Sequence, residues 1–193
     1  LPLATLGTFL LWFGWFGFNG GSQLAMGSAA DVDAISNIYI NTNLAAAAGV
    51  VVAIIGTISL YGKVDLTMAL NGALGGLVAI TAEPLAPSPI LAIFIGGVGS
   101  VLVLLTVPLL DRLKIDDVVG AIPVHLVAGI WGTIAVVLSN SDATLGAQLY
   151  GIIVIGLFTV FTSAIAWYAL KLFMGVRVDE QSELDGLDKT ENG

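Results

Sequence analysis

Residues 12–22 read WFGWFGFNGGS, so five aromatic side chains fall within seven positions and the hydroxyl of Ser22 follows them. The faces of aromatic rings carry negative charge density and attract cations. The serine hydroxyl adds a hydrogen-bond acceptor. We therefore expect this segment, placed at the mouth of a membrane helix, to hold a small cation and to remove part of its water.

The only histidine of the chain, His125, lies midway along another apolar segment, residues 117–138, two residues after Pro123. Ionisable groups inside a bilayer are costly and face the protein interior or a pathway. One interpretation is a buried neutral imidazole that bonds to a neighbouring helix. The other is a functional ring, since imidazole accepts a hydrogen bond on one nitrogen and donates one from the other. Pro123 frees a backbone carbonyl and disturbs the helix at this place.

The composition indicates a membrane protein. The 193 residues are 57% hydrophobic and 10% charged, against about 25% charged in soluble domains. The net charge of −8 argues against a nucleic-acid partner, and the lack of cysteine excludes disulfides and thiol chemistry. We expect no cofactor and no metal site. Because the chain starts at Leu1 without a basic segment, we expect no signal peptide and a piece of a longer protein.

Six apolar stretches predict an all-α membrane protein with both termini on one side. A bilayer core needs about 20 residues per helix. The six lysines and arginines all fall on one predicted face, which the positive-inside rule makes cytoplasmic. Phe18 and Ser22 then lie near the outer mouth of the first span. The stretches are residues 3–22, 36–61, 66–82, 90–110, 117–138 and 147–173.

Small and polar residues suggest how these spans pack. Gly72 and Gly76 form a GxxxG pair, which lets helix backbones approach closely in lipid. Asn37 and Asn41 share a helix face and are expected to join helices rather than to bind a ligand. Asp116 and Asp117 precede a span and are expected to cap it.

Taken together, several motifs in order resemble the ammonium transporter family, in particular the Amt branch of the Amt/Mep/Rh superfamily. Family members have eleven membrane helices in an inverted repeat plus a long last helix, and they form trimers. The resemblance is to helices six to eleven, which implies a partial membrane domain at 1–174 and a cytoplasmic tail at 175–193. The motifs are GTFLLWFGWFGFNGGS at 7–22, NTNLAAAAG at 41–49, NGALGGLVAIT at 71–81, DDVVGAIPVHLVAGIWGT at 116–133 and GVRV at 175–178 with GLD at 186–188.

The resemblance also implies roles for individual residues. Phe18 matches one of two phenylalanines of the outer gate, and Ser22 matches the hydroxyl of the outer recruitment site. Trp15 matches an aromatic residue that lines the pore below the gate. His125 matches the second of two paired pore histidines, and Thr81 matches a threonine near the inner part of the pathway. An ammonium ion would be recruited, lose its proton and cross as ammonia past the histidine.

The tail resembles a regulatory segment that contacts P-II signalling proteins, through Glu183, Gly186, Leu187 and Asp188. The first pore histidine and the partner gate phenylalanine belong to the family's first half. We therefore expect the chain to need a complementing N-terminal half and not to conduct efficiently alone. The expected location is the cell membrane, in contact with lipid.

Three other readings stay open at this point. The chain could be an ammonium sensor, or a split or non-functional transporter half. The remote third reading is an intramembrane serine protease, with Ser22 as the nucleophile and His125 as its base. The resemblance itself implies a transporter and not an enzyme.

Overall fold

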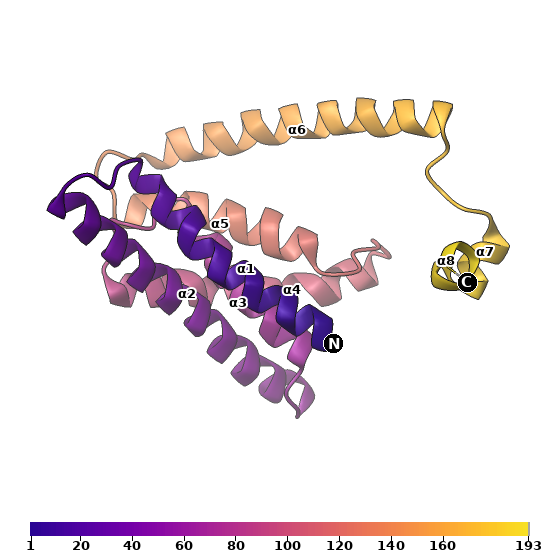
Figure 1. The fold of residues 1–193 in the computed structure, drawn as a ribbon, viewed down its shortest axis with the longest axis horizontal. Coiled ribbons are helices and arrows are strands. Elements are labelled where there is room, and N and C mark those ends of the chain that lie inside the picture. Colours follow the sequence, from indigo (N-terminus) through magenta and orange to yellow (C-terminus); the bar gives the residue numbers. More distant parts are fainter. Residues whose placement is uncertain (193) are drawn as a thin grey trace. The chain divides into compact units, whose positions relative to one another are not determined.

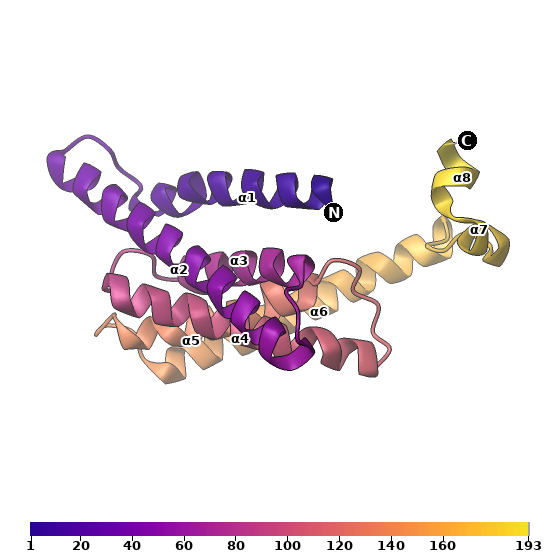
Figure 2. The ribbon, with the colours of Figure 1, turned by 90° about the horizontal axis from the view of Figure 1, so that it is seen from below.

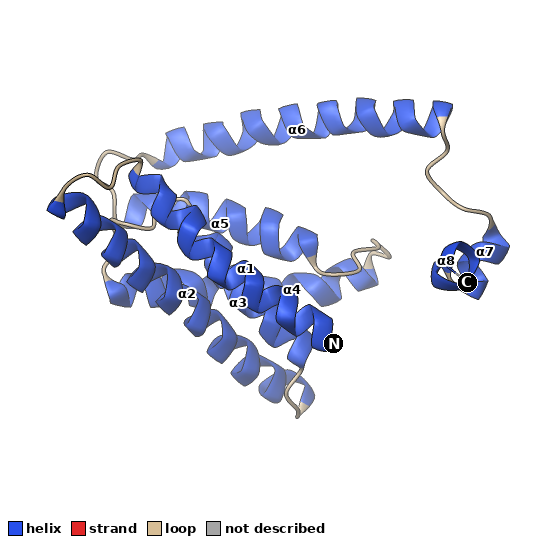
Figure 3. Cartoon of the chain, viewed as in Figure 1, coloured by secondary structure: helices blue, strands red, loops and turns tan. Residues whose placement is uncertain are grey.

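The computed structural model of the protein describes residues 1–192, which contain helices joined by loops and no strand (Figure 3). They form two units, Leu1–Leu149 and the residues from Tyr150 onward, which are described separately. The first unit holds the helices that carry the site (Figure 1). Its long helices are α1 (Pro2–Gly20), α2 (Ala29–Tyr61), α3 (Leu66–Thr81) and α4 (Pro89–Arg112), followed by η2 (Ile122–Val127), α5 (Ala128–Ala135) and η3 (Val136–Leu138). The remaining long helix is α6 (Leu145–Phe173), which the unit boundary divides, and the last two are α7 (Glu180–Asp185) and α8 (Leu187–Asn192).

Polar residues at the helix ends explain where these helices start. Ser28 and Asp31 form a capping box at α2, in which each side chain accepts a hydrogen bond from the other residue's backbone N–H. Asp65 caps α3 and Ser88 caps α4 by accepting an N–H three residues on. At the other end of α2, Gly62 has a φ of +71°, a left-handed conformation that glycine adopts at low cost.

Close backbone contacts hold α2, α3 and α4 together, as Figures 1 and 2 show. A Cβ atom on Gly76 would meet the Ala45 carbonyl and lie 3.2 Å from the Cα of Ala46. Ser100 on α4 donates a hydrogen bond of 2.8 Å to the carbonyl of Gly49 on α2. The small residues therefore form the contact ridges that the sequence predicts, with the backbones too close for larger side chains.

The asparagines of α2 behave differently from one another. The buried Asn41 donates two hydrogen bonds, to the carbonyls of Pro84 and Pro87 at 3.0 and 2.8 Å. It thereby fastens the loop between α3 and α4 to α2, as expected for a residue that joins helices. Asn37, on the predicted shared face, is exposed.

Three described helices are long and apolar enough to cross a membrane, namely α2, α4 and α6. The segments Leu66–Thr81 and Ile122–Leu138 are shorter apolar helices. The predicted count of six spans and the side of the termini therefore stay predictions. The predicted boundary after residue 174 also stays a prediction, because the compact units divide at Leu149.

Candidate functional site

An open pocket of about 400 Å³ brings together the C-terminal half of α1, the end of α3 and one face of η2 and α5. We call it the aromatic pocket. Four residues that the sequence singles out line it, although they come from distant parts of the chain. The lining residues are Trp15, Phe18, Val78, Thr81, Ala82, His125, Gly129 and Thr133.

Two consecutive hydrogen bonds hold the aromatic side chains that form one wall of this pocket. The Trp15 indole N–H donates to the Thr81 hydroxyl over 2.8 Å. The Thr81 hydroxyl in turn donates to the carbonyl of Leu77 on its own helix over 2.7 Å. Phe18 packs against Trp15 with ring centroids 5.7 Å apart. The Thr81 hydroxyl donates its hydrogen to the Leu77 carbonyl, so its oxygen is free to accept the hydrogen bond from the Trp15 indole. This bond holds the indole ring at a defined angle.

His125 projects from a π-helical turn. Pro123 lies in the first turn of this segment, where an N–H would have no partner within the helix, so its missing N–H is tolerated directly before the histidine. Asp117 stabilises the start of the turn, since its two carboxylate oxygens accept the N–H groups of Ala121 and Ile122, each at 2.8 Å. The capping role expected for Asp117 is therefore confirmed, and π-turns of this kind are common at functional sites.

A second pocket, of about 490 Å³, lies on the other side of the same imidazole. It is lined by the first half of α1, the first turns of α3 and residues 118–121, together with Val124 and His125. His125 is the one lining residue that this second pocket shares with the aromatic pocket. The imidazole is exposed rather than enclosed by helix contacts, so it stands between two openings.

Glycine at position 120 shapes the second pocket. Gly120 has a φ of +78°, and a Cβ atom there would lie 2.8 Å from the side-chain nitrogen of Asn71. A larger residue at this position would be strained and would displace the Asn71 amide. The amide and the glycine therefore fit each other at the edge of the pocket.

The structure places Ser22 outside both pockets of His125 and Thr81 next to Trp15, and the roles expected for these two residues stay predictions. Ser22 lies in η1 (Gly21–Gln23), is exposed, and is not among the residues that line either pocket of His125. The protease reading is therefore not supported, because nucleophile and base do not share a pocket. Thr81 lies beside Trp15 at one wall of the aromatic pocket, because the two side chains are bonded to each other, and its expected place near the inner part of the pathway stays a prediction.

The sequence analysis does not single out the lining residues Gly129 and Thr133, although their spacing from His125 indicates them. Gly129 and Thr133 follow His125 at intervals of four residues and share its helix face. Thr133 donates its hydroxyl hydrogen to the carbonyl of Gly129 at 2.9 Å, so its oxygen can still accept. A search for small and polar residues at this spacing would have found both.

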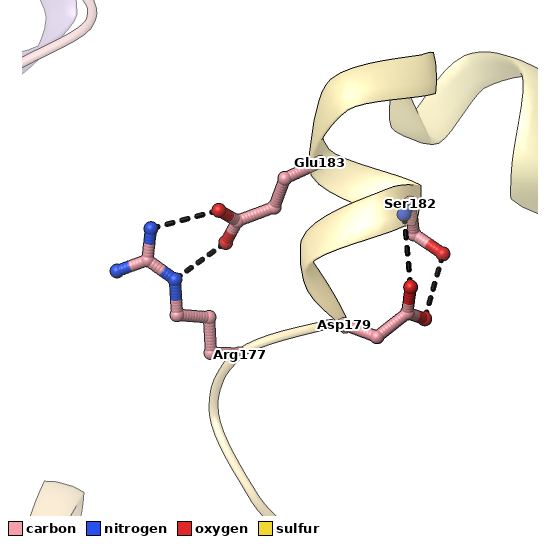
Figure 4. Close-up of polar contacts among 4 residues, drawn as sticks. All are labelled: Arg177, Asp179, Ser182 and Glu183. Atoms are coloured by element: carbon pink, nitrogen blue, oxygen red, sulfur yellow. Dashed lines mark hydrogen bonds and ion pairs between the residues drawn. The ribbon is translucent and has the colours of Figure 1, made fainter.

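The tail forms its own small structure, which Figure 4 shows. The Arg177 guanidinium donates two hydrogen bonds to the carboxylate of Glu183, at 2.5 and 2.8 Å. Asp179 caps α7 by accepting the N–H and the hydroxyl of Ser182. The hydrogen bond from Arg177 lowers the pKa of Glu183, and the backbone N–H of Ser182 lowers the pKa of Asp179. Gly186, with a φ of +91°, separates α7 from α8.

Comparison with known proteins identifies the relatives of this chain. It matches the Ammonium Transporter Family over residues 1–193. A Synechocystis protein named as an ammonium transporter is 44% identical over 98% of this chain and 44% of its own length. The ammonium transporter Amt2 of Archaeoglobus fulgidus is 39% identical, covering 100% of this chain and 44% of its own.

The fold agrees with this comparison. A solved structure titled "Sensor Amt Protein" superposes with a TM-score of 0.90 at 37% identity, over 100% of this chain and 49% of that one. The chain thus spans 44% of the length of each of these two curated relatives. The relatives with curated names are transporters and not enzymes. The chain, an apolar helical membrane protein, belongs to the ammonium transporter family.

Proposed function

We propose that this chain forms one wall of a pathway that carries ammonium, as ammonia plus a proton, across a membrane. The observation that carries the proposal is the position of His125 between two pockets. A ring in this place contacts any solute that passes from one pocket to the other. The names of the relatives support ammonium as the substrate.

The aromatic pocket is suited to receiving the cation. A cation over an aromatic ring gains about 0.5–2 kcal/mol per ring, and the pocket offers the rings of Trp15 and Phe18. The oxygens of Thr81 and Thr133 add acceptors for N–H groups. Ser22, one turn beyond Phe18 along the chain, would act earlier, as an acceptor at the outer entrance.

At the imidazole, the charged ammonium ion stops and the neutral ammonia passes. A bare cation at bilayer depth costs several kcal/mol or more, so the ion is expected to release its proton before it passes. His125 can accept a hydrogen bond from ammonia on one nitrogen and donate one to it from the other. Beyond the ring, the amide of Asn71 is one of the polar groups of the second pocket, which Thr8 and Thr67 also line.

The pathway needs a second wall. His125 and Phe18 are exposed, and both pockets are open, so the chain alone does not enclose a solute. We propose that a complementing set of helices, corresponding to the rest of the longer relatives, closes the open side. As in the family, the assembled protein would be a trimer in the cell membrane.

The proposal includes the orientation of the chain in the membrane and the regulation of transport through its tail. The distribution of lysine and arginine favours cytoplasmic termini. The residues of the tail motif, Glu183, Gly186, Leu187 and Asp188, would then face the compartment in which P-II proteins occur. Glu183 is already engaged by Arg177, so a P-II partner would meet a preformed tail. A sensor role is not favoured, because the curated relatives are named as transporters.

Currents after an ammonium jump in liposomes test the proposal. A suitable protein is a chimaera in which this chain replaces its aligned segment in the Archaeoglobus Amt2 relative. The chimaera is expected to give ammonium-dependent current, and the isolated chain to give little. Strong current from the isolated chain would refute the need for a second wall, and none from a folded chimaera would refute the pathway.

A further inference from the structure

Two loops that follow the helices of the aromatic pocket are joined by a side-chain hydrogen bond that the proposed pathway does not use. The Asn140 amide donates to the Glu83 carboxylate over 3.1 Å. Glu83 lies two residues after Thr81, beyond the end of α3, and Asn140 lies two residues after η3. We call this contact the Glu83–Asn140 clasp. Its two residues are 57 positions apart, so the bond ties together segments that chain connectivity leaves separate.

Each side chain of the clasp is also fixed within its own loop. The second oxygen of Glu83 accepts the N–H of Ala86 over 3.3 Å. The side-chain oxygen of Asn140 accepts the N–H of Asp142 over 2.9 Å, and the Asn140 backbone N–H donates to the Val136 carbonyl over 3.0 Å. Both side chains are half-buried. Because neither can turn away without losing a second hydrogen bond, the clasp holds the two loops at a defined distance.

The clasp connects the two helical walls that carry the threonine oxygens of the aromatic pocket. Thr81 belongs to α3 and Thr133 to α5. These walls touch at Gly132, where a Cβ atom would lie 3.0 Å from the Cα of Ala79. On each wall the threonine follows this backbone contact in the chain and precedes the clasp. Since the walls are joined on both sides of the threonines, the separation of the two oxygens can change little.

We propose that Glu83 and Asn140 are positioning residues, which hold the two threonine oxygens at a separation that suits ammonium and disfavours a larger alkylammonium ion. This role rests on the proposed function, because it concerns the pocket that receives the cation. An ammonium ion has N–H groups for both oxygens, whereas methylammonium replaces one N–H with a methyl group. Walls that cannot move apart reject the added carbon, and one extra methylene contributes about 10–200-fold to discrimination.

Liposome currents carried by ammonium and by methylammonium through the chimaera described above test this role. Two variants break the clasp with opposite changes of charge. Glu83→Ala removes the carboxylate, and Asn140→Asp places a second carboxylate against it but keeps the acceptor for Asp142. Both should raise the methylammonium-to-ammonium current ratio about fivefold, a part of what one methyl group can contribute. Both should also raise the ammonium concentration for half-maximal current, with the maximal current little changed.

Two further variants separate position from charge. Ser141→Asp adds the same charge as Asn140→Asp at an exposed neighbouring residue and should leave the current ratio unchanged. The double variant Glu83→Gln with Asn140→Asp exchanges donor and acceptor and keeps the net charge. The glutamine amide can donate to the new carboxylate while its oxygen accepts the N–H of Ala86, so the double variant should return to the original ratio.

Three outcomes would overturn the positioning role while the parent chimaera still conducts ammonium. They are an unchanged ratio in both clasp variants, opposite effects of Glu83→Ala and Asn140→Asp, and equal effects of Asn140→Asp and Ser141→Asp. The last two would show that charge, not position, acts on the cation. An absence of ammonium current in the parent chimaera would refute the proposed function and this role with it. The clasp as a contact has its own readout, since the double variant should regain the unfolding midpoint that Asn140→Asp loses.

Discussion

The hydrogen bond from Trp15 to Thr81 can be isolated by two matched substitutions in one pocket. Thr81→Val removes the hydroxyl that bonds Leu77 and also accepts the indole N–H. Thr133→Val makes the same chemical change in the same pocket but removes only a bond to the carbonyl of Gly129. The difference between the two variants is therefore the indole hydrogen bond.

A hydrogen bond of this kind contributes about 1 kcal/mol, and a partly buried donor left without a partner costs up to about 2 kcal/mol. Thr81→Val should thus lower the free energy of unfolding by about 1 kcal/mol more than Thr133→Val does. The assay is denaturant unfolding of the chain in detergent micelles, followed by circular dichroism. A cycle with Trp15→Phe should show a coupling of similar size. Equal losses in the two threonine variants, with no coupling to Trp15, would refute the assigned role of Thr81.

Three further predictions concern packing and the tail. Asn41→Ala should destabilise the chain by about 1–3 kcal/mol, because two loop carbonyls lose their donor, whereas the exposed Asn43→Ala should change the unfolding midpoint little. Gly76→Leu should cost about 1–3 kcal/mol or more through overpacking, seen as a lower melting temperature; unchanged melting would contradict the close approach of α2 and α3. The Glu183 carboxyl should titrate below its ordinary value of 4.5, so that the tail contact persists at neutral pH and is lost as the pH falls through the lowered pKa. An NMR titration should show the midpoint rise in Arg177→Gln, and an unchanged midpoint would exclude the ion pair in solution.

Much of the fold follows from the sequence because local signals determine it. The third predicted span, residues 66–82, corresponds to α3 at Leu66–Thr81, since Asp65 caps its start and the apolar run ends with it. The GxxxG pair correctly predicts a close helix contact, because small residues have few other uses at such density. The histidine stands out because an ionisable residue is expensive to keep in lipid, and the aromatic cluster stands out because aromatic rings attract cations.

Other features depend on contacts that no local pattern records. The second span was predicted to begin at residue 36, whereas α2 begins at Ala29, because the capping box of Ser28 and Asp31 extends the helix beyond its apolar part. The partner of Trp15 is 66 residues away in the chain, so spacing gives no hint of it. Similarly, Ser22 follows the aromatic cluster in sequence, but the turn after α1 carries it away from the pocket.

The most direct test of the account is the effect of the imidazole on ammonium conduction. In the chimaera, His125→Ala should reduce the ammonium-dependent current about tenfold or more, since a group that both accepts and donates is lost from the junction of the two pockets. Leu126→Ala, in the same π-helical turn, changes an exposed residue that lines neither pocket, and it should leave the current unchanged. An undiminished current in His125→Ala would contradict the account and leave the histidine with a packing role alone.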